Sequence, residues 1–214
     1  MRKAIQLAPF YPVLNVADAV SSEASAARAL ALLEALLAGG APWLQLRAKA
    51  LAAGAFVALA REVVERAARG GARVIVNDRL DVALASGAAG VHVGQEDLPL
   101  EAVRAVSGAR LVVGVSTHSV EEARAAEAAG ADYVGFGPMR ETATKADTRP
   151  PRSLEDLRAV RDAVRIPIVA IGGIDEALAG DVLAAGATSV AMIGALERSA
   201  DPAGLVQRLL GRAH

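Results

Sequence analysis

The sequence has no cysteine among its 214 residues. Without thiols the chain can form no disulfide bond, supply no thiolate metal ligand and offer no cysteine nucleophile, which suits a cytoplasmic location. It also has almost no net charge, because 23 basic residues oppose 24 acidic ones. No overall field therefore attracts nucleic acid, and any recognition of phosphate must be local. We expect small-molecule substrates as partners and no nucleic acid, while a homo-oligomer is compatible with the sequence.

Long hydrophobic runs are missing as well. Pro9, Pro12 and Asn15 interrupt the apolar stretch near the N-terminus before the core of a signal peptide can form. No other stretch is long and apolar enough to cross a membrane. The sequence therefore predicts no membrane partner.

A unit of short apolar run, polar tip and alanine-rich amphipathic segment recurs along the chain. Hydrophobic residues make up 53% of the sequence, enough for a substantial core. The strands expected from the apolar runs are Phe10–Leu14, Trp43–Leu46, Arg73–Val76, Gly90–Val93, Leu111–Val115, Tyr133–Phe136, Pro167–Ile171 and Ser189–Ile193. Eight such units favour an α/β fold, a (β/α)8 TIM barrel, as a single domain over residues 1–214.

A doubly wound open sheet is the structural alternative. It would need a glycine-rich phosphate-binding turn after its first strand, and the segment from Pro9 to Ala19 contains no glycine. Helical patterns separate the strands, and we expect them over Ser25–Ala38, Ala53–Arg69, Ser119–Ala129, Ser153–Val164 and Pro202–Leu210. Ser119 with Glu122 predicts a capping box, and Ser153 with Asp156 predicts a weaker one.

Acidic residues follow two neighbouring strands, at the point where each strand ends. Asp78 comes directly after the third strand, and Asp97 closes the polar cluster after the fourth. Because the carboxyl ends of parallel strands open onto the ligand crevice, two acids delivered there could share one divalent cation. The chain is therefore a candidate enzyme.

The second strand carries unusual polar residues. Alternation along a strand places Gln45, Arg47 and Lys49 on one side, with Leu44 and Leu46 on the other. If the leucines face the helices, Gln45 and Arg47 point into the barrel mouth, where a guanidinium needs anionic partners. An arginine and a lysine together at a strand end favour phosphate binding, and a structural ion pair is the alternative.

Three further segments favour phosphate recognition. The long loop after the sixth strand contains Thr142, Ala143, Thr144 and Lys145, whose hydroxyls and ammonium could bind phosphate oxygens; a solvated connector is the alternative. Glycines stand at the ends of the seventh and eighth strands, in residues 172–173 and at position 194. Barrel enzymes frequently bind phosphate with backbone amides of the loops after these two strands.

Together these motifs resemble the thiamine phosphate synthase family. The residues that carry the resemblance are Gln45-x-Arg47-x-Lys49, Asn77-Asp78-Arg79, the run from Gly90 to Asp97, Gly114-Val115-Ser116, the run from Gly130 to Gly135, and the run from Ala170 to Ile174. That family is understood to join a hydroxymethylpyrimidine diphosphate to a thiazole phosphate on a (β/α)8 barrel with Mg²⁺. It releases pyrophosphate by a dissociative displacement that requires no protein nucleophile.

The resemblance also implies roles for individual residues. Asp78 and Asp97 would bind Mg²⁺, and the expected catalytic residues are Arg47, Lys49, Lys145 and Ser116. The pyrimidine and its diphosphate would be held by Gln45, Arg47, Lys49, Asn77, Ser116 and Lys145. The thiazole phosphate would be held by Thr142, Ala143, Thr144, Gly173, Ile193 and Gly194.

Two alternatives accompany this interpretation. The sister family of thiazole tautomerases uses a histidine at the loop of His118, and a non-catalytic phosphate-binding barrel is the other alternative. His92 alternates with valines, so it points into the barrel in either a structural or a functional role.

The sequence departs from the family pattern in three places. Arg140 and Glu141 replace a hydrophobic residue and a proline that are usual in the family. Gly194 stands where a serine is common, and Leu14-Asn15 matches the usual first-strand tip poorly.

Overall fold

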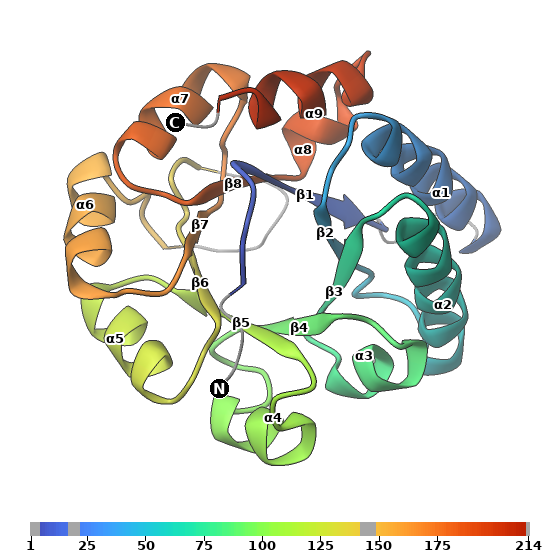
Figure 1. Cartoon of the computed structure of the whole chain (residues 1–214), viewed down its shortest axis with the longest axis horizontal. Helices are drawn as coiled ribbons and strands as arrows, with labels where there is room; N and C mark the ends of the chain where they lie inside the picture. Colours follow the sequence, from blue (N-terminus) through green and yellow to red (C-terminus); the bar gives the residue numbers. More distant parts are fainter. Residues whose placement is uncertain (1–4, 17–21, 142–148, 213–214) are drawn as a thin grey trace.

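The computed structural model describes residues 5–16, 22–141 and 149–212. Eight parallel strands form a closed barrel in which each strand pairs with the next and β8 returns to β1 (Figure 1). The strands are β1 (Phe10–Asn15), β2 (Trp43–Arg47), β3 (Arg73–Asn77), β4 (Gly90–Val93), β5 (Val112–Thr117), β6 (Tyr133–Phe136), β7 (Ile168–Ala170) and β8 (Ser189–Met192). The (β/α)8 expectation is confirmed, and the open sheet is not adopted.

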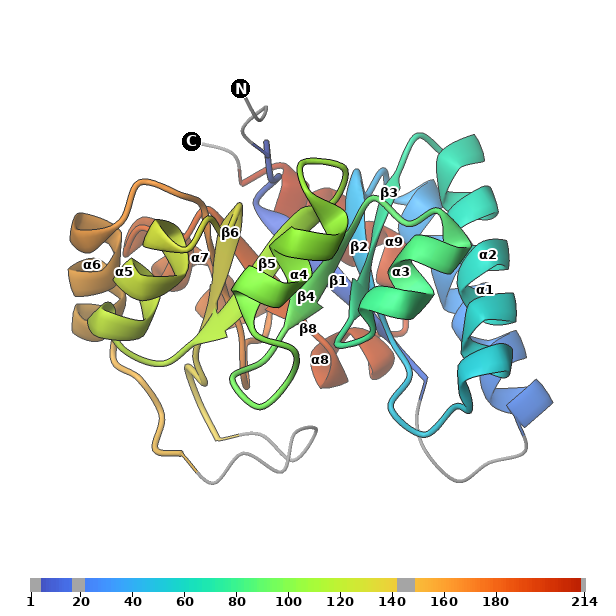
Figure 2. The same ribbon diagram turned by 90° about the horizontal axis from the view of Figure 1, so that it is seen from below.

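Helices surround the strands as an outer ring in Figure 1, and the loops that follow β2 and β4 lie along the lower edge of Figure 2. The helices are α1 (Ser22–Ala38), α2 (Ala53–Arg69), α3 (Leu80–Ser86), α4 (Leu100–Ser107), α5 (Val120–Ala128), α6 (Leu154–Ala163), α7 (Glu176–Ala184), α8 (Gly194–Glu197) and α9 (Pro202–Leu210). In the part of the chain that the structure describes, no helix has the length and apolar character needed to span a membrane.

The core has two layers because successive residues of a strand point to opposite sides. Leu44 and Leu46 of β2 belong to the layer between barrel and helices, whereas Gln45 bonds to a residue of the barrel interior. This confirms the orientation predicted for β2. The apolar residues buried inside the barrel include Ile5, Tyr11, Val13, Trp43, Ile75, Tyr133, Val169, Ala191 and Ile193.

The predicted helix caps have different outcomes. Ser153 and Asp156 form a complete capping box at the start of α6, since each side chain accepts a bond from the other's backbone N–H. At α5 the Ser119 side chain accepts from the Glu122 N–H, as expected. The Glu122 carboxylate, however, accepts from the N–H of His118 at 2.7 Å, one residue before the position that a capping box uses. The backbone before α5 is thereby fixed beside the barrel mouth.

Candidate active site

Asp78 and Asp97 come together at the carboxyl ends of β3 and β4. Asp78 has a φ of 63°, a left-handed conformation that aspartate tolerates better than most residues, and its N–H donates to the carbonyl of His92 at 2.7 Å. Asp97 is held by the N–H of Gly94, which donates to its Oδ2 at 2.7 Å. Backbone bonds from β4 and its loop thus position both acids.

The electrostatics of this pair are those of two carboxylates in contact. Burial raises the pKa of Asp78, and the hydrogen bond and charge of Asp97 raise that pKa further. The ammonium of Lys49 lies 3.3 Å from Asp78 Oδ2 and acts in the opposite direction. The pair therefore needs a counter-ion when both acids are ionised.

These residues fit a magnesium ion. Mg²⁺ is usually bound through one or two carboxylates together with substrate phosphates and water. Asp97 Oδ2 accepts from Gly94, and a carboxylate has a second oxygen with which to bind a cation. Among the described residues no group of three or more acidic, histidine or cysteine side chains is placed so that it could hold a metal ion. A two-carboxylate arrangement completed by phosphate oxygens is thus the metal chemistry that this donor set supports.

Arg47 lies at the end of β2, next to the tip of β1. Its NH1 donates to Asn15 Oδ1 at 2.7 Å, and Asn15 Nδ2 donates to Glu197 Oε1 at 3.2 Å. The Arg47 Nε atom is buried, and it has no hydrogen-bond partner in the described part of the chain. Arg47 is therefore tethered by one neutral amide, which leaves guanidinium donors for an anionic ligand. The structural ion pair considered as an alternative is not formed with any described residue.

A chain of hydrogen bonds crosses the barrel interior below the site. Gln45 Nε2 donates to the Tyr11 hydroxyl at 3.5 Å, and the hydroxyls of Tyr11 and Tyr133 are 3.1 Å apart. His92 joins Tyr133 to Ser116, with Nδ1 3.0 Å from the Tyr133 hydroxyl and Nε2 2.9 Å from Ser116 Oγ. Gln45 and Ser116, both predicted to contact the pyrimidine diphosphate, are thus the two ends of one array.

The tyrosines of this array were not among the predicted site residues. Burial raises the pKa of both Tyr11 and Tyr133 above the usual value, so both hydroxyls stay protonated at neutral pH. Each can accept from one neighbour and donate to the next, and the two nitrogens of the His92 imidazole lie within hydrogen-bond distance of Tyr133 and Ser116. The sequence signal that could have found them is a polar aromatic residue at an inward position of a barrel strand.

Gly114 makes room for this array. A Cβ atom on Gly114 would overlap the ring of Tyr133. We expect Gly114→Ala to lower the free energy of unfolding by about 1–3 kcal/mol, the usual cost of overpacking a core. Thermal and urea unfolding measure this loss. Gly54→Ala on α2 is the matched control, because a Cβ there meets nothing within 4 Å and alanine favours helix. Equal stability of the Gly114 variant and the parent would contradict the packing described.

The other predicted diphosphate ligands have distinct surroundings. Asn77 is only 6% exposed, and it pairs with His92 in the register of β3 and β4. Lys49 is exposed apart from its ion pair with Asp78. His118 lies outside the interior array: its Nδ1 donates to the carbonyl of Gly137 at 2.6 Å. A carbonyl can only accept, so Nδ1 carries the proton in that bond.

The predicted thiazole-phosphate residues fall into two groups. Thr142, Ala143 and Thr144, together with Lys145, lie outside the described residues. Gly173 is described: its φ is 66°, and a Cβ there would collide with the Cβ of Arg140. Ile193 and Gly194 stand at the junction of β8 and α8.

Arg140, one of the departures from the family pattern, packs against the loop after β7. Its N–H donates to the carbonyl of Gly172 at 2.9 Å, and its NH1 lies 3.4 Å from Asp175 Oδ2. The glycine pair in residues 172–173 is thus needed for the close approach of this segment. The structure gives Arg140 a bridging position between two loops of the barrel mouth.

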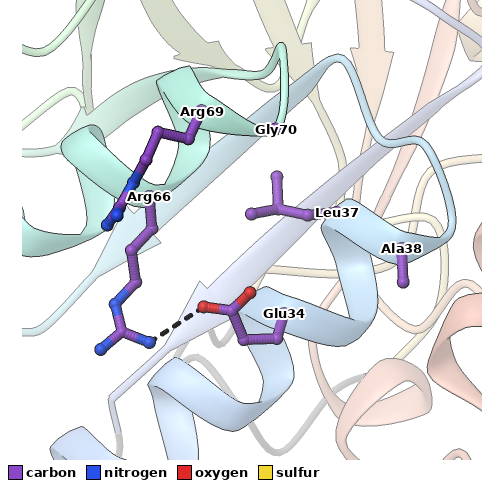
Figure 3. Close-up of a pocket in the computed structure, with 6 residues that line it drawn as sticks. All are labelled: Glu34, Leu37, Ala38, Arg66, Arg69 and Gly70. Carbon is purple, nitrogen blue, oxygen red and sulfur yellow. Dashed lines mark hydrogen bonds and ion pairs between the residues drawn. The ribbon is translucent and has the colours of Figure 1, made fainter.

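A surface pocket of about 680 Å³ lies between α1 and α2 and contains none of the predicted site residues (Figure 3). It is lined by Glu34, Leu37, Ala38, Arg66, Arg69 and Gly70. Arg66 donates to Glu34 at 2.9 Å and to Glu62 at 2.6 Å, so its charge is already balanced by two carboxylates. This pocket offers no chemistry comparable with that at the strand ends.

Comparison with known proteins identifies relatives of this chain. The family described as thiamine monophosphate synthase matches residues 15–196. A thiamine-phosphate synthase of Moorella thermoacetica is 49% identical over 180 residues, which are 84% of this chain and 86% of that protein. One from Methanospirillum hungatei is 50% identical over 165 residues, or 77% of this chain and 80% of that protein.

Solved structures resemble the chain over nearly all of its length. The thiamine phosphate pyrophosphorylase of Pyrococcus furiosus superimposes with a TM-score of 0.82 at 32% identity, covering 95% of this chain and 94% of that one. A 3-hexulose-6-phosphate synthase of Salmonella typhimurium superimposes with a TM-score of 0.69 at 18% identity, covering 96% of this chain and 100% of that one. The second likeness shows a shared fold alone.

Proposed function

The chain belongs to the thiamine monophosphate synthase family, and from this we propose how its site works. The reaction joins 4-amino-2-methyl-5-hydroxymethylpyrimidine diphosphate to 4-methyl-5-(2-phosphoethyl)thiazole and gives thiamine phosphate and pyrophosphate. We propose that Mg²⁺ assists this reaction. The observation that carries the proposal is the contact of Asp78 with Asp97 beside Lys49.

The diphosphate is the substrate group that these residues suit best. Asp78 and Asp97 would hold Mg²⁺, which when bound neutralises charge on the diphosphate and its leaving group. Arg47 and Lys49 add positive charge from the end of β2, and we assign Lys145 the same task on the basis of its motif. The diphosphate carries two or three negative charges and is repelled by the two carboxylates. The positive charges of Mg²⁺ and the basic side chains must therefore exceed the negative charges of Asp78 and Asp97.

The proposed reaction step is a dissociative displacement. The bond between the pyrimidine methylene carbon and the diphosphate oxygen breaks, and its electron pair leaves with pyrophosphate. The lone pair of the thiazole nitrogen then forms the new carbon–nitrogen bond, so no proton has to move. Arg47, Lys49, Lys145 and Ser116 act by stabilising the departing negative charge, a task for preorganised donors.

The interior array supports the pyrimidine side of this site. Gln45 and Ser116 are held at the two ends of the Tyr11, Tyr133 and His92 chain, so their orientation is fixed before the substrate arrives. Asn77, buried beside His92 at the end of β3, is the further expected contact of the pyrimidine diphosphate. His92 is therefore assigned a positioning role.

The opposite side of the barrel mouth is assigned to the thiazole phosphate. We propose that Gly173, Ile193 and Gly194 bind it mainly through backbone groups, and that Thr142, Ala143 and Thr144 complete the pocket. Backbone N–H groups suit this task because they present partial positive charge without bulk. The glycine at position 194 removes one hydroxyl donor relative to the serine common in the family, which on the scale of one net hydrogen bond is about 1 kcal/mol.

We also propose where the protein acts and how it is organised. We infer a cytoplasmic enzyme that acts on small molecules, with no nucleic-acid or membrane partner. A homo-oligomer is compatible with it. The whole chain over residues 1–214 is taken as one domain.

The test is formation of thiamine phosphate by the purified protein. With both substrates and Mg²⁺ we expect product and pyrophosphate in equal amounts, and with EDTA we expect turnover to fall to background. Activity that is unchanged by EDTA would remove the metal assignment. If no product forms under either condition, the tautomerase assay follows, with His118 as the first residue to replace.

A further inference from the structure

The tip of β1 is joined to the end of β2 by both a backbone and a side-chain hydrogen bond. Asn15 and Arg47 are register partners, and the N–H of Val16 donates to the Arg47 carbonyl at 2.7 Å. The 2.7 Å bond from Arg47 NH1 to Asn15 Oδ1 adds a side-chain link to this backbone link. The Asn15 amide is therefore carried on a backbone that is itself fixed relative to Arg47.

Glu197 fixes which way the Asn15 amide points. A guanidinium can only donate and an ionised carboxylate can only accept, so an amide between Arg47 and Glu197 has a single arrangement that satisfies both. The amide oxygen must face Arg47, and the amide nitrogen must face Glu197. The Asn15 side chain has no equally good alternative orientation.

The same link reaches the other side of the barrel mouth. Glu197 is the last residue of α8, which begins at Gly194 and is separated from β8 by Ile193 alone. Asn15 and Glu197 are 182 positions apart in the chain and meet because β8 closes the barrel against β1. The hydrogen-bonded chain from Arg47 to Glu197 thus connects the end of β2 with the segment after β8.

We propose that Asn15 is a positioning residue that holds the Arg47 guanidinium ready for the diphosphate. This inference rests on the proposed function of Arg47. The acceptor is a neutral amide, so Arg47 loses rotamer freedom while its charge stays available to the substrate. Glu197 acts one step further away by orienting the amide.

The first test is Asn15→Ala. We expect KM for the pyrimidine diphosphate and the inhibition constant of pyrophosphate each to rise about tenfold, the effect of losing one hydrogen bond to a charged group. KM for the thiazole phosphate should change less than about twofold, because backbone groups and not Arg47 bind that substrate. A loss of both affinities to the same extent, or of neither, would overturn the proposal.

The second test exchanges donor and acceptor. Asn15→Asp alone keeps an acceptor for Arg47 but sets a carboxylate against Glu197. Adding Glu197→Gln supplies an amide that can donate to the new carboxylate, so we expect the double variant to bind pyrophosphate more tightly than Asn15→Asp alone. It should stay weaker than the parent, because a carboxylate at position 15 neutralises part of the Arg47 charge that the neutral amide leaves available. Glu65→Gln on α2 is the control for loss of an exposed carboxylate. A double variant that binds pyrophosphate no better than Asn15→Asp alone would contradict the orienting role of residue 197.

Binding measurements separate this inference from the proposed function. Calorimetric titration of pyrophosphate with Mg²⁺ reports on Arg47 whether or not product forms. Failure of the parent protein to make thiamine phosphate would count against the proposed function alone. Equal pyrophosphate affinity of a folded Asn15→Ala variant and the parent would count against Asn15 alone.

Discussion

Replacing Asp97 with asparagine should lower kcat/KM at least about 100-fold at a fixed low concentration of Mg²⁺, since loss of even an outer partner of a metal ligand costs 10–100-fold. The variant keeps an acceptor for the N–H of Gly94 but removes the carboxylate that contacts Asp78. Excess Mg²⁺ should restore part of the activity, because the site is weakened and not destroyed. A magnesium titration of initial rates measures both effects.

The stability of the same variant gives an independent reading. The pKa of Asp78 is raised, and a carboxyl with a raised folded-state pKa contributes its full stability below its unfolded pKa and loses it as the pH rises through the folded pKa. At neutral pH the metal-free protein therefore bears the repulsion of Asp97 on Asp78. In EDTA at neutral pH we expect the melting temperature of the Asp97→Asn variant to be no lower than that of the parent. Any excess in melting temperature over the parent should disappear in acid.

Glu96→Gln is the matched control for this prediction. Glu96 is an exposed carboxylate next to Asp97 in the same loop, and it does not contribute to the raised pKa of Asp78. Its variant should keep the magnesium dependence of the parent. An Asp97→Asn variant whose magnesium titration superimposes on that of the parent would show that the two carboxylates do not share a cation.

Periodicity explains why the barrel could be predicted from the sequence. Each strand is a short apolar run that ends in polar or glycine residues, and the inward and outward sides of β2 follow from alternation alone. The positions of Asp78 and Asp97 could also be predicted, because each acid comes after a predicted strand and the two strands are consecutive in the chain. These features depend on residues that are close together in the chain.

Features that depend on closure of the barrel could not be predicted in the same way. Tyr11 and Tyr133 are 122 positions apart, and their contact requires the strands that carry them to face each other across the interior. The bond between Asn15 and Glu197 requires β8 to lie beside β1. Alternation says that such side chains point inward or stand at a strand end, but it does not say which of them meet.

The contact made by Arg140 could not be predicted from the sequence either. The sequence marks it as a departure from the family pattern and says nothing about its partner. In the structure it bridges to Asp175, 35 positions away, after passing close to Gly173. Arg140 thus joins two loops next to the barrel mouth. The absence of side chains on the glycine pair permits the close approach that this contact needs.

Replacing Arg47 with methionine should lower kcat/KM about 100- to 1,000-fold, the range seen when one preorganised donor to developing charge is removed. Methionine keeps much of the apolar stem and removes the guanidinium that Asn15 holds at the end of β2. KM for the pyrimidine diphosphate should rise, whereas KM for the thiazole phosphate and the dependence on Mg²⁺ should stay near those of the parent. Steady-state kinetics with each substrate varied in turn separates these quantities.

Two further variants make this result specific to Arg47. Arg47→Lys keeps the charge but loses the planar fork, so we expect an intermediate loss of activity and not full recovery. Arg61→Met removes an arginine of α2 that donates to the carbonyl of Ala85 outside the site, and its kinetics should match those of the parent. If Arg47→Met raised KM for both substrates equally, one guanidinium would serve both phosphate groups. The division of the barrel mouth into a diphosphate side and a thiazole-phosphate side would then be wrong.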